Sequence, residues 1–133
     1  MYGNASFYDN RFGDFVIQSS GGDTVLTGNR LPISPDTILN GGFVVSPTAQ
    51  IDVTLDVKRV GEVMVDQLNT VPLDGYTLVD TALTWRRGPL RITLSAQNLF
   101  NTEYYWSGDG SLAESADPGR PRQVLVTTSI VLR

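Results

Sequence analysis

The sequence contains neither cysteine nor histidine. Without thiols or imidazoles, the chain cannot form disulfides, bind a metal through cysteine or histidine, or perform Ser-His-Asp catalysis. Basic residues are also few, since 10 lysines and arginines stand against 14 acidic residues, for a net charge of −4. The pairs Lys58-Arg59 and Arg86-Arg87 are isolated, so the basic patch that nucleic-acid binding requires is missing. These absences exclude thiol chemistry, histidine chemistry and nucleic-acid binding.

Long apolar runs are absent as well. The longest candidates, such as Gly42–Val45 and Ile130–Leu132, are far shorter than the ~18 apolar residues that a membrane-spanning helix needs. The first six residues have neither the basic nor the apolar region of a secretory signal peptide. We therefore expect either a cytosolic protein or a piece of a longer chain.

Apolar and polar side chains alternate with a period of two in several segments, and only a β-strand turns that period into one apolar and one polar face. In the clearest case, Ile51, Val53, Leu55 and Val57 alternate with polar residues. The pattern predicts about six strands and no helix, at Tyr2–Tyr8, Thr37–Ser46, Ile51–Lys58, Tyr76–Trp85, Leu90–Gln97 and Gln123–Leu132.

The predicted connections alternate in length. Residues 46–49 and 86–89 are tight turns, whereas residues 9–35, 61–74 and 100–121 form long links. Short turns on one rim and long loops on the other are typical of a transmembrane β-barrel, and strands of about ten residues match the ~9–11 that cross a bilayer at a tilt. Because successive strands run in opposite directions, the last strand is expected to end on the rim of the short turns.

A soluble β-sandwich shares this alternation and must be weighed against the barrel. Charges in the middle of the polar faces, at Asp52, Asp56, Asp80 and Arg91, suit the wet interior of a barrel but also the outer face of a sandwich. Trp85, beside a tight turn, fits either an aromatic girdle at a membrane interface or a core tryptophan at a strand end. Periodicity alone leaves both architectures open.

Three motifs narrow the choice. One opens a strand, a second follows the penultimate strand, and a third precedes the last strand; their residues are Gly75, Tyr76 and Asp80, then Asn98, Leu99, Phe100 and Tyr104, then Pro118, Gly119, Arg120, Pro121 and Arg122. An earlier segment, Gly28–Pro35, precedes a predicted strand in a similar way. In order and spacing, these motifs resemble the C-terminal part of the barrel of TonB-dependent outer-membrane receptors.

The resemblance implies an all-β fold, an antiparallel meander of about six strands that is part of a transmembrane β-barrel. Residues 1–133 would be the C-terminal barrel segment of such a receptor, with no plug domain and no signal peptide present. Complete members have ~22 strands and usually end on an aromatic residue, whereas this chain offers about six strands and ends on Leu132-Arg133. We therefore expect a fragment that is inactive alone.

In function, the resemblance implies TonB-dependent uptake of a ferric siderophore or similar bulky nutrient across the outer membrane. The implied partners are the remainder of the barrel and its plug, the inner-membrane TonB complex through the missing N-terminal part, outer-membrane lipid and a siderophore-like ligand. The competing prediction is a soluble all-β binding or structural domain, which the missing signal peptide favours.

Five residues near the last long loop are candidates for ligand contact. Tyr104, Tyr105 and Trp106 could stack on an aromatic or iron-chelate ligand, and Arg120 and Arg122 could attract an anionic one. The alternative is that the aromatics anchor the strand end at the outer interface, while the arginines bind neighbouring loops or lipid headgroups.

Other chemistry is not indicated by the sequence. Asp52 and Asp56 share a strand face but lie too far apart to share a proton. The segment Ser107–Ser111 has one carboxylate and lacks the pattern of a calcium loop. We expect no enzymatic activity, no resident cofactor and no metal site.

Overall fold

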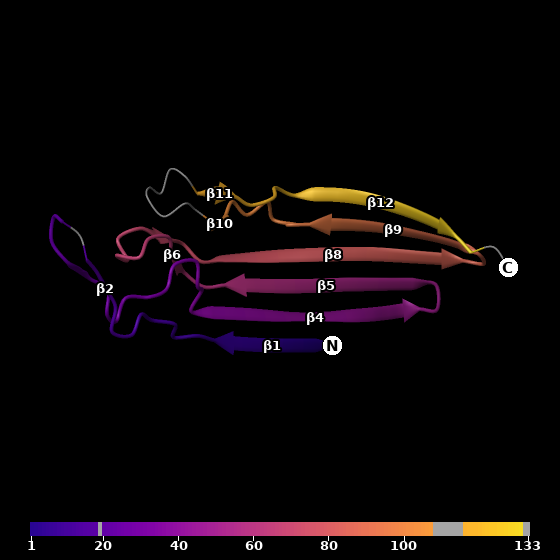
Figure 1. Ribbon diagram of the computed structural model, residues 1–133. Coiled ribbons are helices and arrows are strands. Elements are labelled where there is room, and N and C mark those ends of the chain that lie inside the picture. The colour runs from indigo at the N-terminus through magenta and orange to yellow at the C-terminus, as the bar shows by residue number, and fades with distance from the viewer. Residues whose placement is uncertain (19, 108–115, 132–133) are drawn as a thin grey trace.

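In the computed structural model, which describes residues 1–18, 20–107 and 116–131, the centre is a six-stranded sheet. Neighbouring strands pair antiparallel in the order β1-β4-β5-β8-β9-β12 (Figure 1). Their bounds are β1 (Tyr2–Phe7), β4 (Thr37–Thr48), β5 (Ile51–Val60), β8 (Tyr76–Arg87), β9 (Leu90–Gln97) and β12 (Gln123–Ile130). The all-β meander predicted from the period-two pattern is confirmed.

Six further strands are short and lie inside the long loops. They pair as three ribbons: β2 (Val16–Ile17) with β3 (Thr24–Val25), β6 (Val63–Met64) with β7 (Pro72–Leu73), and β10 (Tyr105–Ser107) with β11 (Asp117–Pro118). Periodicity did not predict them, because two or three residues are too few to show an alternation. No helix long and apolar enough to cross a membrane occurs within the described ranges.

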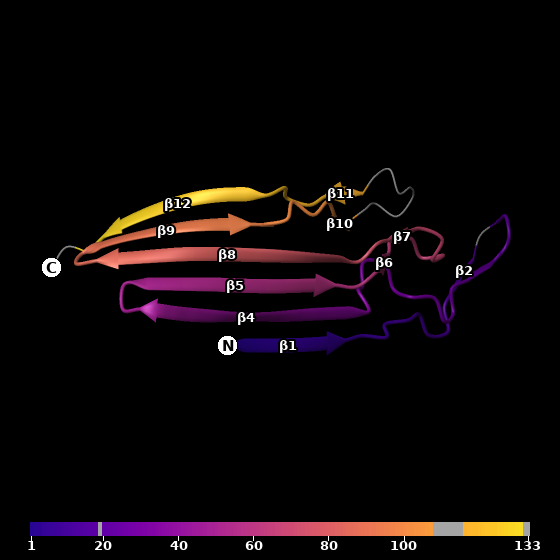
Figure 2. The ribbon, with the colours of Figure 1, turned by 180° about the vertical axis from the view of Figure 1, so that it is seen from behind.

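The long loops gather at one end of the sheet, and the tight turns and the end of β12 lie at the other (Figures 1 and 2). We call these ends the loop rim and the turn rim. At the turn rim, Gly88-Pro89 forms the predicted β8–β9 turn, with Gly88 at a φ of 57° that glycine adopts without strain. The arrangement of short and long connections is the one that the sequence predicted.

The turn between β4 and β5 lies two residues later than expected. The sequence predicted a turn at residues 46–49, but β4 continues through Pro47 to Thr48 and the chain turns at Ala49-Gln50. The β4–β5 register shifts between Val45 and Thr48, and such an irregularity tolerates a proline, which cannot donate a ladder hydrogen bond. The prediction was wrong because Pro47 was taken as part of a turn.

The pairing registers place most apolar side chains of the long strands on one face, which we call the apolar face, although Ile38, Val44, Leu78 and Leu125 lie on the other. Across β4, β5, β8, β9 and β12, for example, Val45 lies opposite Val53, Val53 opposite Leu83, Leu83 opposite Leu94, and Leu94 opposite Val126. The other face, the polar face, carries the side chains of Asn4, Asn40, Asp52, Thr54, Asp56, Lys58, Asp80, Thr84, Arg86, Arg91, Thr93, Ser95, Gln97, Thr127 and Ser129, among others.

Among the described residues, no second layer covers the apolar face. The side chains of Leu83 and Val126 remain 46% and 68% exposed. The buried hydrophobic residues of the described chain are instead in or next to the loop rim, at Leu26, Val60, Val63, Val65 and Leu73. A soluble sandwich would bury this face against a second sheet, so the described structure gives the sandwich no support.

Trp85 lies on the apolar face beside the turn rim, opposite Ile51 of β5 and Ile92 of β9. None of the buried hydrophobic residues of the described chain is near this end of the sheet. Trp85 is half-buried and lies away from these residues, which disfavours the core interpretation and favours that of a girdle residue. The loop-tip residues 108–111 and the C-terminal pair Leu132-Arg133, both discussed from the sequence, lie outside the described ranges.

Candidate functional site

The three motifs meet at the loop rim, where Asn98 connects them. Asn98 is 4% exposed and directly follows β9 with a φ of 48°, a left-handed conformation that asparagine tolerates better than most residues. Its backbone N–H donates to Asp80 Oδ1 at 2.8 Å. Its side-chain Nδ2 donates to the carbonyls of Thr102 and Arg120, at 2.9 and 3.0 Å, and its Oδ1 accepts the N–H of Thr102 at 2.8 Å. The backbone and side chain of one buried asparagine thus tie together β8, the loop after β9 and the segment before β12.

A second contact joins the same segments through Tyr104. Its ring lies against the ring of Tyr76, with centroids 4.3 Å apart. The N–H of Gly119 donates to the Tyr104 carbonyl at 2.7 Å, and the N–H of Arg120 donates to the Tyr104 hydroxyl at 3.3 Å. A Cβ atom on Gly119 would come within 2.1 Å of the Tyr104 ring. Only glycine therefore allows this close approach.

Replacing Gly119 by alanine is expected to expel Tyr104 from this contact and to lower the free energy of unfolding by about 1–3 kcal/mol, the usual cost of overpacking. In a Y104A background the same G119A change should cost little, because the alanine then meets no ring. Urea unfolding in detergent micelles followed by circular dichroism would measure both. Equal destabilisation by G119A in the presence and absence of the Tyr104 ring would contradict the proposed clash.

The five ligand-contact candidates fall into two groups: three make contacts with other residues of the loop rim, and two are exposed. Tyr104 and Arg120 belong to the contact just described, and the Arg122 backbone N–H donates to Asn101 Oδ1 at 2.9 Å. The Arg122 guanidinium also donates to the Leu99 carbonyl, at a long 3.4 Å. By contrast, Tyr105 and Trp106, in β10, are 50% and 58% exposed. Tyr104, Arg120 and Arg122 therefore contact other residues of the loop rim, whereas the rings of Tyr105 and Trp106 are exposed.

A half-open hollow of about 340 Å³ lies beside this framework. It is lined by Asn101, Thr102, Glu103, Tyr104, Tyr105, Pro118, Gly119 and Pro121. This volume falls in the range that holds small molecules, and aromatic and proline surfaces suit a flat ring. Neither Arg120 nor Arg122 lines the hollow, whereas Glu103 does, so the expected attraction of an anion by these arginines is not built into its wall.

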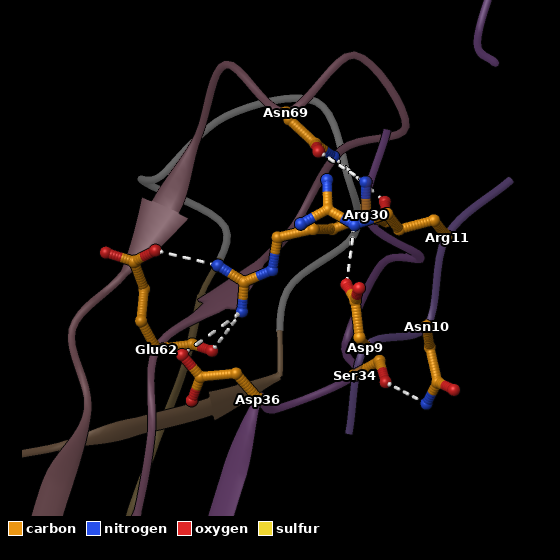
Figure 3. Close-up of polar contacts among 8 residues, drawn as sticks. All are labelled: Asp9, Asn10, Arg11, Arg30, Ser34, Asp36, Glu62 and Asn69. Carbon is orange, nitrogen blue, oxygen red and sulfur yellow. Dashed lines mark hydrogen bonds and ion pairs between the residues drawn. The ribbon is translucent and has the colours of Figure 1, made fainter. Parts of the chain in front are cut away.

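The loop of residues 8–36 is fastened to the loop of residues 61–75 by Arg30 (Figure 3). The guanidinium of Arg30 donates to Glu62 Oε1 at 2.9 Å and to the Glu62 carbonyl at 2.8 Å, and it lies 3.9 Å from Asp36 Oδ2. Its backbone exchanges two hydrogen bonds with the side chain of Asn69, at 2.6 and 2.9 Å. Sequence reasoning included Arg30 in the segment Gly28–Pro35 but assigned it no role, because its hydrogen-bond partners Glu62 and Asn69 lie more than 30 residues away.

Asp66 organises the tip of the second loop. Its buried carboxylate accepts the N–H groups of Thr70 and Val71, both at 2.8 Å, and the Thr70 hydroxyl at 2.9 Å. Burial alone would raise the pKa of Asp66, but the hydrogen bonds from Val71 and Thr70 outweigh it and hold this pKa below its usual value. The loop conformation is thereby linked to the ionised carboxylate.

Because the pKa of Asp66 is lowered in the folded loop, ionisation stabilises the loop at pH values above the unfolded pKa of about 3.9. That stabilisation should be lost as the pH falls through the lower, folded pKa. We expect the amides of Thr70 and Val71 to stay protected from hydrogen exchange, after correction for intrinsic rates, down to the unfolded pKa of about 3.9 and to lose protection as the pH is lowered further. D66N should be less protected at neutral pH and insensitive to this change, whereas D74N, on the same loop, should behave as wild type.

On the polar face, the register brings two carboxylates opposite each other, at Asp56 of β5 and Asp80 of β8. They line a small hollow of about 100 Å³ together with Tyr2, Asn40, Lys58 and other residues. Nearer the turn rim, Asp52 accepts a hydrogen bond from the Ser46 hydroxyl at 2.7 Å and pairs with Arg86. Sequence reasoning compared Asp52 with Asp56 and missed the pair of Asp56 with Asp80, because only strand register reveals a cross-strand neighbour.

No group of residues within the described ranges could hold a metal ion through three or more histidine, cysteine or carboxylate side chains.

No family model matches the sequence, and no curated protein matches it. Solved structures do. The siderophore receptor PiuA from Acinetobacter baumannii is 18% identical, with a TM-score of 0.77 over 86% of this chain and 17% of that one. The ferric yersiniabactin uptake receptor FyuA from Yersinia pestis is 24% identical, with a TM-score of 0.69 over 84% of this chain and 18% of that one.

The ferric-catecholate import receptor Fiu from E. coli, in its closed form, is 24% identical, with a TM-score of 0.68 over 81% of this chain and 17% of that one. This chain thus spans less than a fifth of the length of these receptors. At such identities the similarity shows the fold, which is that of a section of a β-barrel receptor. The resemblance drawn from the sequence motifs is confirmed at this level.

Proposed function

We propose that the six-stranded sheet is a section of the wall of an outer-membrane β-barrel receptor that takes up a siderophore or similar bulky chelate in a TonB-dependent manner. The bare apolar face is the observation that carries this proposal. Leaving apolar surface in water costs about 25 cal/mol per Å², whereas acyl chains cover it without that cost. The polar face then meets the barrel interior, and the loop rim faces outward.

The two edges of the sheet support a larger barrel. In the described structure, β1 and β12 each pair on one side only. In hydrocarbon, every backbone group left unpaired along such an edge costs several kcal/mol, so spanning sheets close into barrels. We propose that further barrel strands pair with both edges and that a plug covers the polar face. Energy would reach the receptor through the inner-membrane TonB complex.

Ligand contact at the loop rim is part of the same proposal. The exposed rings of Tyr105 and Trp106 and the hollow beside Tyr104 offer flat surfaces to a chelate. Arg120 and Arg122 hold the rim together through backbone and side-chain hydrogen bonds, which supports a positioning role for them. The proposed role is non-enzymatic, in line with the receptors and importers that share the fold.

Detergent dependence separates this proposal from a soluble all-β domain. We expect the purified chain to aggregate in plain buffer and to recover β structure and a single species in mild detergent, observed by circular dichroism and size-exclusion chromatography. A folded, monodisperse, β-rich chain in buffer alone would instead identify a soluble domain and end the membrane proposal.

A further inference from the structure

Two arginines occupy positions of the apolar face, one near each rim. Arg59 of β5 lies opposite Leu39 and Thr77, and Arg87 of β8 lies opposite Leu90. Between these two levels, the positions of β5 and β8 on this face are uncharged: Ile51, Val53, Leu55 and Val57, then Thr77, Val79, Thr81, Leu83 and Trp85. Both arginines are exposed, and neither forms an ion pair with a described residue.

The spacing of the two arginines matches one membrane thickness. Ten residues of β8 separate Thr77, at the level of Arg59, from Arg87. At ~3.3 Å per residue this is ~33 Å along the strand, and at a barrel tilt of ~40° it is ~25 Å along the membrane normal. An outward apolar band of ~25 Å is what outer-membrane barrels present to lipid. Arg59 and Arg87 therefore lie at the two headgroup levels.

Arg59 differs from Arg87 in its surroundings, because it lines an open hollow of about 670 Å³ at the loop rim. The wall of this hollow is formed by Asp36, Thr37, Leu39, Arg59, Gly61, Glu62, Asp74 and Gly75. Leu39 and Arg59 are opposite each other on the apolar face, so the hollow continues directly from the lipid-facing surface. The Arg59 guanidinium makes one side-chain contact within the described residues, a long 3.4 Å hydrogen bond to the Thr77 hydroxyl.

The charges in this hollow favour a headgroup of mixed sign. Arg30 binds Glu62 and approaches Asp36, as described above. Arg59 and Asp74 have no such ion-pair partner among the described residues. Counted with Arg30, the five ionised groups sum to −1, so an anion alone would meet net repulsion. A group that carries a phosphate and an ammonium together would satisfy both Arg59 and Asp74.

We propose that the hollow around Arg59 binds the phosphoethanolamine headgroup of a membrane lipid, with the phosphate on Arg59, the ammonium on Asp74 and the acyl chains on the adjoining apolar face. This inference rests on the proposed membrane location of the sheet. It assigns to the loop rim a lipid site that is separate from the hollow beside Tyr104.

The test is a titration of the full chain, folded in a non-ionic detergent, with dihexanoyl-phosphatidylethanolamine, followed by calorimetry. We expect R59Q and D74N each to weaken binding about tenfold, the scale of a charge-assisted hydrogen bond. The matched controls R87Q and D14N change an exposed arginine and an exposed aspartate outside the hollow and should bind as wild type. Dihexanoyl-phosphatidylcholine, whose quaternary nitrogen donates no hydrogen bond, should bind the wild type less tightly.

Equal binding by R59Q, R87Q and the wild type would overturn the headgroup site, as would an undiminished affinity of D74N. Circular dichroism on each variant confirms that a loss of binding is not a loss of fold. If the chain is β-rich only in detergent and the variants bind equally, the lipid site fails and the proposed function survives. A chain that is monodisperse and folded in buffer alone defeats both.

Discussion

Asn98→Ala is expected to lower the free energy of unfolding by about 3–5 kcal/mol, the largest effect we predict for one substitution. The change leaves the N–H and carbonyl of Thr102 and the carbonyl of Arg120 without their partner in a partly buried place. Each unsatisfied buried group costs about 1–3 kcal/mol. Alanine at the observed φ of 48° adds strain on the order of 1 kcal/mol. Urea unfolding in detergent micelles would measure the loss.

Asn101→Ala is the matched control. Asn101 is also an asparagine with positive φ, at 53°, but it is exposed, and its side chain accepts one hydrogen bond, from Arg122. We expect the free energy of unfolding of this variant to fall by about 1–2 kcal/mol, because of backbone strain at positive φ and the loss of one exposed hydrogen bond. If the two variants were equally stable, the side-chain amide of Asn98 would not be the element that joins the loop after β9 to the segment before β12.

Leu83→Arg is expected to give the second large effect. For the chain in lipid vesicles, it should lower the free energy of unfolding by about 2–4 kcal/mol. Leu83 lies near the middle of the apolar face, between Val53 and Leu94, so the arginine would enter the hydrocarbon region. Ala82→Arg is its control, because the neighbouring residue lies on the polar face, between Thr54 and Ser95, where a charge meets water. We expect the control to remain within about 0.5 kcal/mol of wild type, as surface substitutions usually do.

In plain buffer the difference between these two variants should shrink or reverse, because an arginine on an apolar surface is then solvated and reduces aggregation. Unfolding of both variants in vesicles and solubility of both in buffer give the comparison. Equal stability of Leu83→Arg and Ala82→Arg in vesicles would mean that the two faces meet the same medium, contrary to the barrel-wall interpretation.

The sequence predicted the long strands well because each is long enough for the period-two pattern to show. The expected segment Leu90–Gln97 coincides with β9, and Ile51–Lys58 differs from β5 only by its last two residues. The pattern failed where structure depends on partners: Pro47 lies within β4 because the β4–β5 pairing is irregular there. The short ribbons of the loops form for the same reason, from contacts that a local pattern cannot show.

For the site, the motif resemblance selected residues that do converge in space, but it did not give their roles. Tyr104 and Arg122 were candidates for ligand contact, whereas their observed contacts are with Tyr76, Asn101 and Leu99. The contact that Arg30 makes between the first two loops went unassigned, because its hydrogen-bond partners Glu62 and Asn69 lie more than 30 residues away and leave no local pattern. Long-range pairing is the information that a single sequence lacks.

The absence of cysteine makes one measurement especially direct. Single cysteines at Val53 and Leu83, on the apolar face, and at Thr54 and Ala82, on the polar face, can each carry a spin label in lipid vesicles. The account predicts that collisions with oxygen, which dissolves in hydrocarbon, dominate at the first pair and that collisions with a water-soluble nickel complex dominate at the second. Equal exposure of both pairs to the nickel complex, with no alternation along β5 and β8, would contradict a lipid-facing barrel wall.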